Sequence, residues 1–179
     1  MPVNTPRRSL LASRKRGKNL TYVIGFTGHQ TLPRQVGEFV QSRLAELLND
    51  YDRKTIGITS LARGADQLFA RCILSGRFSL GVVIPCERYE ESFSSDADRT
   101  SYHELLSQAD EVEHLPFPYP SEEAYYAAGR RIVDRSDQMI AVWDGEPSRG
   151  FGGTADIVNY ATSLGIGVTT IWPPGARRV

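Results

Sequence analysis

From Tyr22 onward, short apolar runs of strand length alternate with longer stretches whose apolar residues recur every three or four positions. The runs predict strands at residues 22–27, 55–59, 80–84, 112–117, 138–143 and 167–172, and the stretches predict helices at 36–48, 65–74, 102–109, 121–136 and 154–164. Strict alternation favours a parallel sheet with helices on both faces. We therefore predict an α/β fold, a Rossmann-like three-layer sandwich with a mainly parallel sheet of about six strands.

Charge divides the chain into two parts. The first 18 residues hold six basic side chains and no acidic one, which is typical of a flexible arm. The remaining 161 residues carry a net charge of −6. We predict a basic arm over 1–20 and one Rossmann-like domain over 21–179, in which residues 87–100 form the longest irregular stretch and a candidate lid over a ligand.

The placement of cysteines, histidines and apolar residues disfavours several classes of site and location. Cys72 and Cys86 lie 14 positions apart and the three histidines are scattered, so we expect free thiols, no metal site and no cofactor. No run approaches the 18 apolar residues of a membrane span, and the Arg7-Arg8 pair lacks the apolar stretch of an export signal. The expected location is the cytoplasm, away from membranes.

In a sheet of this kind, ligands bind beyond the carboxyl ends of the strands, where the strand order reverses. Three loops that follow strands are rich in glycine or hydroxyl groups, and each leads into a helix. Main-chain amides at such helix starts, and a guanidinium fork, favour phosphate oxygens. The candidate ligand contacts are Gly25, Thr27, Gly28 and His29 in the first loop, Ser60, Arg63 and Gly64 in the second, and Asp144, Gly152, Gly153 and Thr154 in the third.

Structural roles remain open for several of these residues. Thr59 or Ser60 could cap a helix, and Arg63 could form a surface ion pair. Asp144 could accept a hydrogen bond from a ribose hydroxyl or hold the glycine loop. Thr154 could cap its helix as well as contact a phosphate.

Two motifs resemble a known superfamily. Thr59-Ser60-Leu61-Ala62-Arg63-Gly64-Ala65-Asp66 is similar to the Ser-Gly-Leu-Ala-Arg-Gly-Ile-Asp loop of bacterial DNA-processing (Smf/DprA) proteins. Gly152-Gly153-Thr154, followed by Tyr160-Ala161 and Gly165, resembles the glycine-threonine helix of the lonely-guy phosphoribohydrolases, and residues 102–161 resemble small YpsA-like proteins. All belong to the SLOG superfamily of Rossmann-like nucleotide-binding domains. The resemblance covers about residues 22–173.

The resemblance also contains a departure at the catalytic position. In the phosphoribohydrolases a catalytic glutamate stands three residues after the loop threonine, and the corresponding residue here is Ile157, which can neither attack nor carry a proton. Asp156 lies one residue earlier, about 100° around the helix, and would point elsewhere. Whether the chain is an enzyme is therefore left open.

The resulting expectation is a module, a sensor or regulator, that binds a nucleotide or another phosphate-bearing small molecule. One alternative is hydrolysis of a nucleotide's N-glycosidic bond by a relocated carboxylate, for which Glu90, Glu91, Asp96 and Asp98 are candidates. A second alternative is single-stranded DNA binding through the basic arm, because the rest of the chain is net acidic. A homodimer is an open alternative for its assembly.

Overall fold

The computed structural model describes residues 21–178, so the predicted basic arm lies outside the described residues. Six strands alternate with five α-helices and one short 3-10 helix. In chain order they are β1 (Val23–Gly28), α1 (Arg34–Leu48), β2 (Ile56–Thr59), α2 (Ala65–Ser75), β3 (Ser79–Ile84), η1 (Tyr89–Ser92), α3 (Asp96–Leu106), β4 (Glu111–His114), α4 (Glu122–Arg135), β5 (Gln138–Val142), α5 (Thr154–Ser163) and β6 (Gly167–Ile171).

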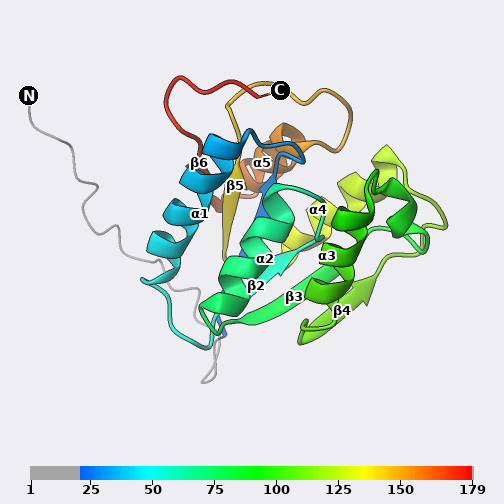
Figure 1. Cartoon of the computed structure of the whole chain (residues 1–179), viewed down its shortest axis with the longest axis horizontal. Coiled ribbons are helices and arrows are strands. Elements are labelled where there is room, and N and C mark those ends of the chain that lie inside the picture. The colour runs from blue at the N-terminus through cyan, green and yellow to red at the C-terminus, as the bar shows by residue number, and fades with distance from the viewer. Residues whose placement is uncertain (1–20, 179) are drawn as a thin grey trace, which may run out of the picture.

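The strands form one sheet in the order β4-β3-β2-β1-β5-β6, and every neighbouring pair is parallel. The chain runs outward from β1 to β4 and then returns to the other side of β1 to add β5 and β6. Helices α1, α2 and α3 cover one face of the sheet, and α4 and α5 cover the other (Figure 1). The predicted Rossmann-like three-layer sandwich is confirmed.

Apolar residues fill the space between the sheet and each helical layer. On the α1 to α3 side, Phe26 of β1 stacks on Phe69 of α2 with ring centroids 4.4 Å apart. On the other side, α4 lies very close to β1, because Gly25 has no side chain: a Cβ there would overlap Ser136 Oγ and Met139 Sδ. Gly25 therefore lets α4 pack directly on the central strand.

One segment differs from the sequence prediction. Residues 87–100, expected to be irregular, contain η1 and the first turn of α3, which begins at Asp96 rather than Tyr102. The Ser95 hydroxyl caps α3 by accepting a hydrogen bond from the Asp98 amide at 3.1 Å. Tyr89 and Phe93 are buried against Tyr102, so this segment belongs to the core. The sequence prediction missed these aromatic residues because they stand among acidic residues that show no helical period.

Two other predictions concern where α4 begins and where β4 ends. Ser121 caps α4 as expected, accepting from the Ala124 amide at 3.1 Å. The strand predicted at 112–117 is shorter, because β4 ends at His114, ahead of the prolines. Among residues 21–178, no helix has the length and apolar character needed to cross a membrane.

Candidate functional site

The strand order reverses between β1 and β5, and a cavity of about 450 Å³ opens at the carboxyl ends of these strands. Figure 1 shows the loops of this region gathered at one end of the sheet, next to the C-terminal segment. The cavity is lined by the end of β1 and the loop after it, by the loop after β2 and the start of α2, and by Pro85 and Tyr89 beyond β3. The rest of the lining comes from α4, from the loop before α5 and the first residues of α5, and from Arg178 in the C-terminal segment. Its volume is in the range of small-molecule sites.

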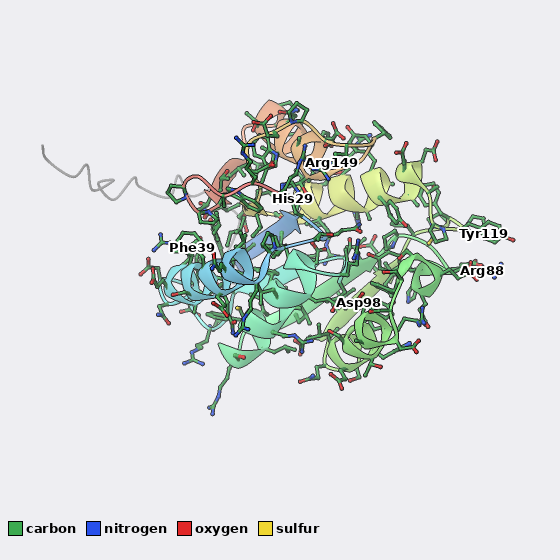
Figure 2. The ribbon with its side chains drawn as sticks, turned by 45° about the horizontal axis from the view of Figure 1, so that its top comes forward. His29, Phe39, Arg88, Asp98, Tyr119 and Arg149 are labelled. Atoms are coloured by element: carbon green, nitrogen blue, oxygen red, sulfur yellow. The ribbon has the colours of Figure 1, made fainter. Side chains whose placement is uncertain are left out.

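The loop after β1 is held by contacts with the segment after β5. The His29 amide donates to the Val142 carbonyl at 3.1 Å, and His29 Nε2 lies 3.0 Å from Asp144 Oδ1. The His29 ring also meets Trp172 edge to face at 5.3 Å. Figure 2 shows His29 at the end of β1, with Arg149 above it on the loop before α5.

Burial and pairing set the charges around His29. Burial lowers the pKa of His29, and this effect outweighs the Asp144 carboxylate, so the imidazole is neutral at pH 7. Burial alone would raise the pKa of Asp144, but the Glu146 amide, His29 and Arg178 together hold that pKa below its ordinary value. Arg178 Nε lies 3.3 Å from Asp144 Oδ2, and Asp144 therefore ties the C-terminal segment to the site.

The loop after β2 is organised by the buried carboxyl of Asp66. Asp66 Oδ2 accepts from Thr59 Oγ1 at 2.8 Å and from the Ser60 amide at 3.3 Å. Burial raises the pKa of Asp66 to about 7, although hydrogen bonds from Thr59, Ser60 and Ala62 oppose the rise. The amides of Ser60 and Ala62 are therefore already occupied inside the protein.

Gly64 and Arg63 have different positions in this loop. Gly64 is the N-cap of α2 with φ +80°, and a Cβ there would come within 2.9 Å of the His29 carbonyl oxygen. Arg63 is half-buried and lines the cavity. Within residues 21–178 its guanidinium has neither a hydrogen bond nor an ion pair, so the alternative of a surface ion pair is not seen there.

The loop before α5 repeats the arrangement of the loop before α2. Asp156 Oδ2 accepts from the Gly152 amide at 2.9 Å and from the Gly153 amide at 3.1 Å, so these two amides are occupied as well. The amides of Thr154 and Ala155, the first two of α5, have no partner within the described chain, and both residues line the cavity. The amides left for an anion are thus those of Thr154 and Ala155, two residues further along than the Gly152 and Gly153 amides that the sequence predicted.

The structure brings most of the sequence-predicted residues together. Those that line the cavity are Thr27, Gly28, His29, Ser60, Arg63, Gly152, Gly153 and Thr154. Three do not line it: Gly25 packs against α4, Gly64 supports the loop after β1, and Asp144 holds His29 and Arg178.

Sequence reasoning missed other lining residues. These include Gln30, Thr31, Asp66, Tyr89, Glu122, Tyr125, Arg149, Phe151 and Arg178. Arg149 and Phe151 stand in or beside a glycine loop that the sequence had already marked, so they could have been found. Nothing in the sequence indicated that Tyr125 and Arg178 would reach the same cavity, because they arrive there through long-range packing.

The carboxylates near the cavity bear on catalysis. Ile157 lines the cavity at the position of the phosphoribohydrolase glutamate. The carboxyl groups that line it belong to Asp66 and Glu122, and not to Glu90, Glu91, Asp96 or Asp98. Within residues 21–178, no three His, Cys, Asp or Glu side chains gather closely enough to hold a metal ion.

No protein-family model and no curated protein matches the sequence. Among solved structures, the chain is similar to DNA processing protein A from Streptococcus pneumoniae, with a TM-score of 0.62 and 18% identity over 87% of this chain and 51% of that one. It is also similar to DNA processing protein A from Helicobacter pylori, which is described by its single-stranded DNA binding mode. The TM-score is 0.64 and the identity 12%, over 88% of this chain and 68% of that one. For the molybdenum cofactor binding protein from Rippkaea orientalis, the TM-score is 0.55 and the identity 16%, over 84% of this chain and 76% of that one.

These similarities concern the fold. The chain spans about half the length of the Streptococcus pneumoniae protein, so the two are comparable over one domain. Identities of 12 to 18% do not carry residue roles from one protein to another. The chain has the Rossmann-like fold of DNA processing protein A, as the motif at residues 59–66 implied, and the molybdenum cofactor binding protein shares this fold.

Proposed function

We propose that the chain binds a nucleotide or a nucleotide-derived ligand through its phosphate and works as a sensor or regulatory module. The phosphate lies in the cavity between the Arg63 loop and the start of α5. Relatives of the same fold are described as binding single-stranded DNA or a molybdenum cofactor, and phosphate is common to both ligands.

Arg63 is the observation that carries this proposal. A guanidinium is always charged, and leaving it half-buried without a counter-ion costs free energy unless a ligand supplies the charge. The remaining arginines of the cavity are paired differently: Arg178 is bound to Asp144, and Arg149 has a contact of its own. Among the cavity arginines of residues 21–178, Arg63 is thus the one for which no counter-ion or hydrogen-bond partner is seen.

The start of α5 supplies the complementary donors. The Thr154 and Ala155 amides have no partner in the described part of the chain, and the positive end of the helix dipole favours an anion beside them. Asp156 fixes the preceding loop without occupying these two amides. A phosphate held between them and Arg63 receives donors from the segments that follow β2 and β5, and both of these strands neighbour β1.

A calorimetric titration with AMP, GMP, CMP and UMP tests the proposal. We expect at least one nucleotide to bind, and Arg63→Ala to weaken it by about 10- to 100-fold, because a charge-assisted hydrogen bond contributes about 1.5–3 kcal/mol. Ligand at 100 times its dissociation constant should also raise the unfolding free energy by about 2.7 kcal/mol.

Arg43→Ala is the matched control. Arg43 is an exposed arginine of α1 paired with Glu46, and it does not line the cavity, so its removal should leave binding unchanged. Equal losses in both variants would mean that the effect comes from general charge. If none of the four nucleotides binds, the proposal fails.

Hydrolysis of an N-glycosidic bond is an alternative function that Glu122 favours. Its carboxylate lines the cavity at the first position of α4, close to Gly150. This makes Glu122 the candidate for the relocated carboxylate, in place of Glu90, Glu91, Asp96 and Asp98. Release of free base from a nucleoside monophosphate, abolished by Glu122→Gln with binding retained, would support the enzyme; no release would leave the binding module.

Single-stranded DNA is the other alternative. The net charge of −6 beyond the first 18 residues opposes binding to a phosphate backbone, so this alternative depends on the basic arm. DNA affinity that falls steeply with salt and disappears when residues 1–18 are removed would support it.

A further inference from the structure

We propose that Phe151 is the surface on which the base of the bound nucleotide stacks. This inference rests on the proposed function, since it concerns the other end of the same ligand. It assigns a role in ligand selection to a side chain that the two family motifs do not include.

Phe151 is exposed in a position where exposure is unusual. It is 52% exposed and lines the cavity, although it is a large apolar side chain in the middle of a glycine loop. Contact between this apolar ring and water is unfavourable, and a planar aromatic ligand that covers the ring would remove that contact.

The ring of Phe151 is held in place on one side. It packs on the Tyr126 ring of α4 with centroids 4.5 Å apart and an angle of 47° between the planes. The neighbouring Gly152 has φ +81°, and a Cβ on it would come within 2.8 Å of the Glu122 carbonyl oxygen. The loop therefore lies directly on the start of α4, which fixes the ring before a ligand arrives and lowers the entropic cost of stacking.

The distance along the chain suits a nucleotide. Phe151 precedes Thr154, the first residue of α5, by three positions, and three residues span at most about 10 Å. The backbone of Phe151 and the first amides of α5 are therefore no further apart than about the length of one nucleoside monophosphate. A phosphate on those amides leaves its base close to Phe151.

A second copy of the chain is the other partner that could cover Phe151. The aromatic residues beyond Tyr126 argue against an open docking face there. The Arg130 guanidinium lies 4.7 Å from the centre of the Tyr160 ring, and the Tyr160 hydroxyl donates to Asp134 at 2.7 Å. These groups are already paired with one another, whereas Phe151 is one of the residues that line the cavity.

The test compares a ligand that has a base with one that lacks it. Calorimetry measures the dissociation constants of the tightest-binding nucleoside monophosphate and of ribose 5-phosphate for the wild type, Phe151→Ala, Phe151→Leu and Phe151→Tyr. Tyr119→Ala is the matched control, because Tyr119 is 55% exposed and lies far from His29 and Arg149 in Figure 2. Thermal unfolding and sedimentation check that each variant is folded and keeps its oligomeric state.

We expect Phe151→Ala and Phe151→Leu to weaken the nucleotide by about tenfold or more, as for loss of one base–aromatic stack. Phe151→Tyr should retain the affinity because it retains the ring, and ribose 5-phosphate should be unaffected by all three substitutions. Tyr119→Ala should change nothing.

Three results would overturn the inference: an unchanged nucleotide affinity in Phe151→Ala, equal losses for nucleotide and ribose 5-phosphate, or a change of oligomeric state as the main effect. In each of these cases nucleotide binding by the wild type would leave the proposed function standing. If neither ligand binds the wild type, the proposed function fails and the inference fails with it.

Discussion

Asp66 gives the protein a pH dependence whose sign can be worked out from the structure. Its carboxyl is buried in the loop after β2 and is bound by the Thr59 hydroxyl and the Ser60 amide. Burial raises its pKa from an ordinary value of 3.8 to about 7. The folded state therefore binds a proton in a pH range where the unfolded chain has already released it.

The magnitude follows from the size of this shift. Because the pKa of Asp66 is raised in the folded state, its contribution to the unfolding free energy is fully present below about pH 4, where the carboxyl is protonated in both states. This contribution is lost as the pH rises to about 7. Each pKa unit corresponds to about 1.4 kcal/mol, so about three units amount to about 4 kcal/mol. Above pH 7, Asp66 should contribute no further change.

Asp66→Asn isolates this contribution. The amide keeps an oxygen that can accept from Thr59 and Ser60 but cannot ionise. Urea unfolding of the wild type and the variant between pH 4 and pH 8 gives the difference in unfolding free energy, in which contributions shared by both proteins, such as those of His29 and Asp144, cancel. We expect the wild type to lose about 4 kcal/mol relative to the variant over this range.

A flat difference, or a wild type that gains stability relative to the variant as the pH rises, would refute this reasoning. It would mean that the hydrogen bonds to Asp66 and the start of α2 stabilise the carboxylate more than burial destabilises it.

Two further predictions concern the frame of the site. Asp156→Ala should lower the unfolding free energy by about 1–2 kcal/mol and loosen the loop before α5, because the Gly152 and Gly153 amides lose their acceptor. Urea unfolding measures the loss of stability, and hydrogen exchange of the two amides measures the loosening. Unchanged exchange would contradict the prediction. Gly25→Ala should destabilise the protein by about 1–3 kcal/mol, since the added methyl group overlaps side chains of β5 and of the end of α4. Gly37→Ala in α1 is the control: its methyl group meets open space and should stabilise the protein by up to about 1 kcal/mol. Equal effects at the two sites would exclude overlap as the cause.

The sequence determined the fold because its strands carry their own signal. Runs such as Met139-Ile140-Ala141-Val142 are apolar on both faces, which suits a strand covered by helices on either side. Alternation with helical stretches leaves a parallel sheet as the simple solution, and the switch point directs attention to the loops after β1, β2 and β5. Eight of the eleven predicted site residues accordingly line one cavity.

The acidic stretch at 87–100 shows where this reasoning stops. Its charges suggested a loop, but Tyr89 and Phe93 are buried and Ser95 caps a helix. The positions of Tyr89, Phe93 and Ser95 do not repeat with the period of a helix or a strand, so a search for periodicity does not detect them.

Only the tertiary structure decided which donors remain for a ligand. The sequence marks Gly152, Gly153 and Ser60 as amides that could hold phosphate, yet Asp156 and Asp66 turn back and occupy them. A side chain's choice between a local amide and solvent depends on the exact course of the loop, which packing against other elements fixes. For the same reason the sequence could name Arg63 as a phosphate ligand or a surface ion pair. Only the structure places it beside the cavity, with no counter-ion among residues 21–178.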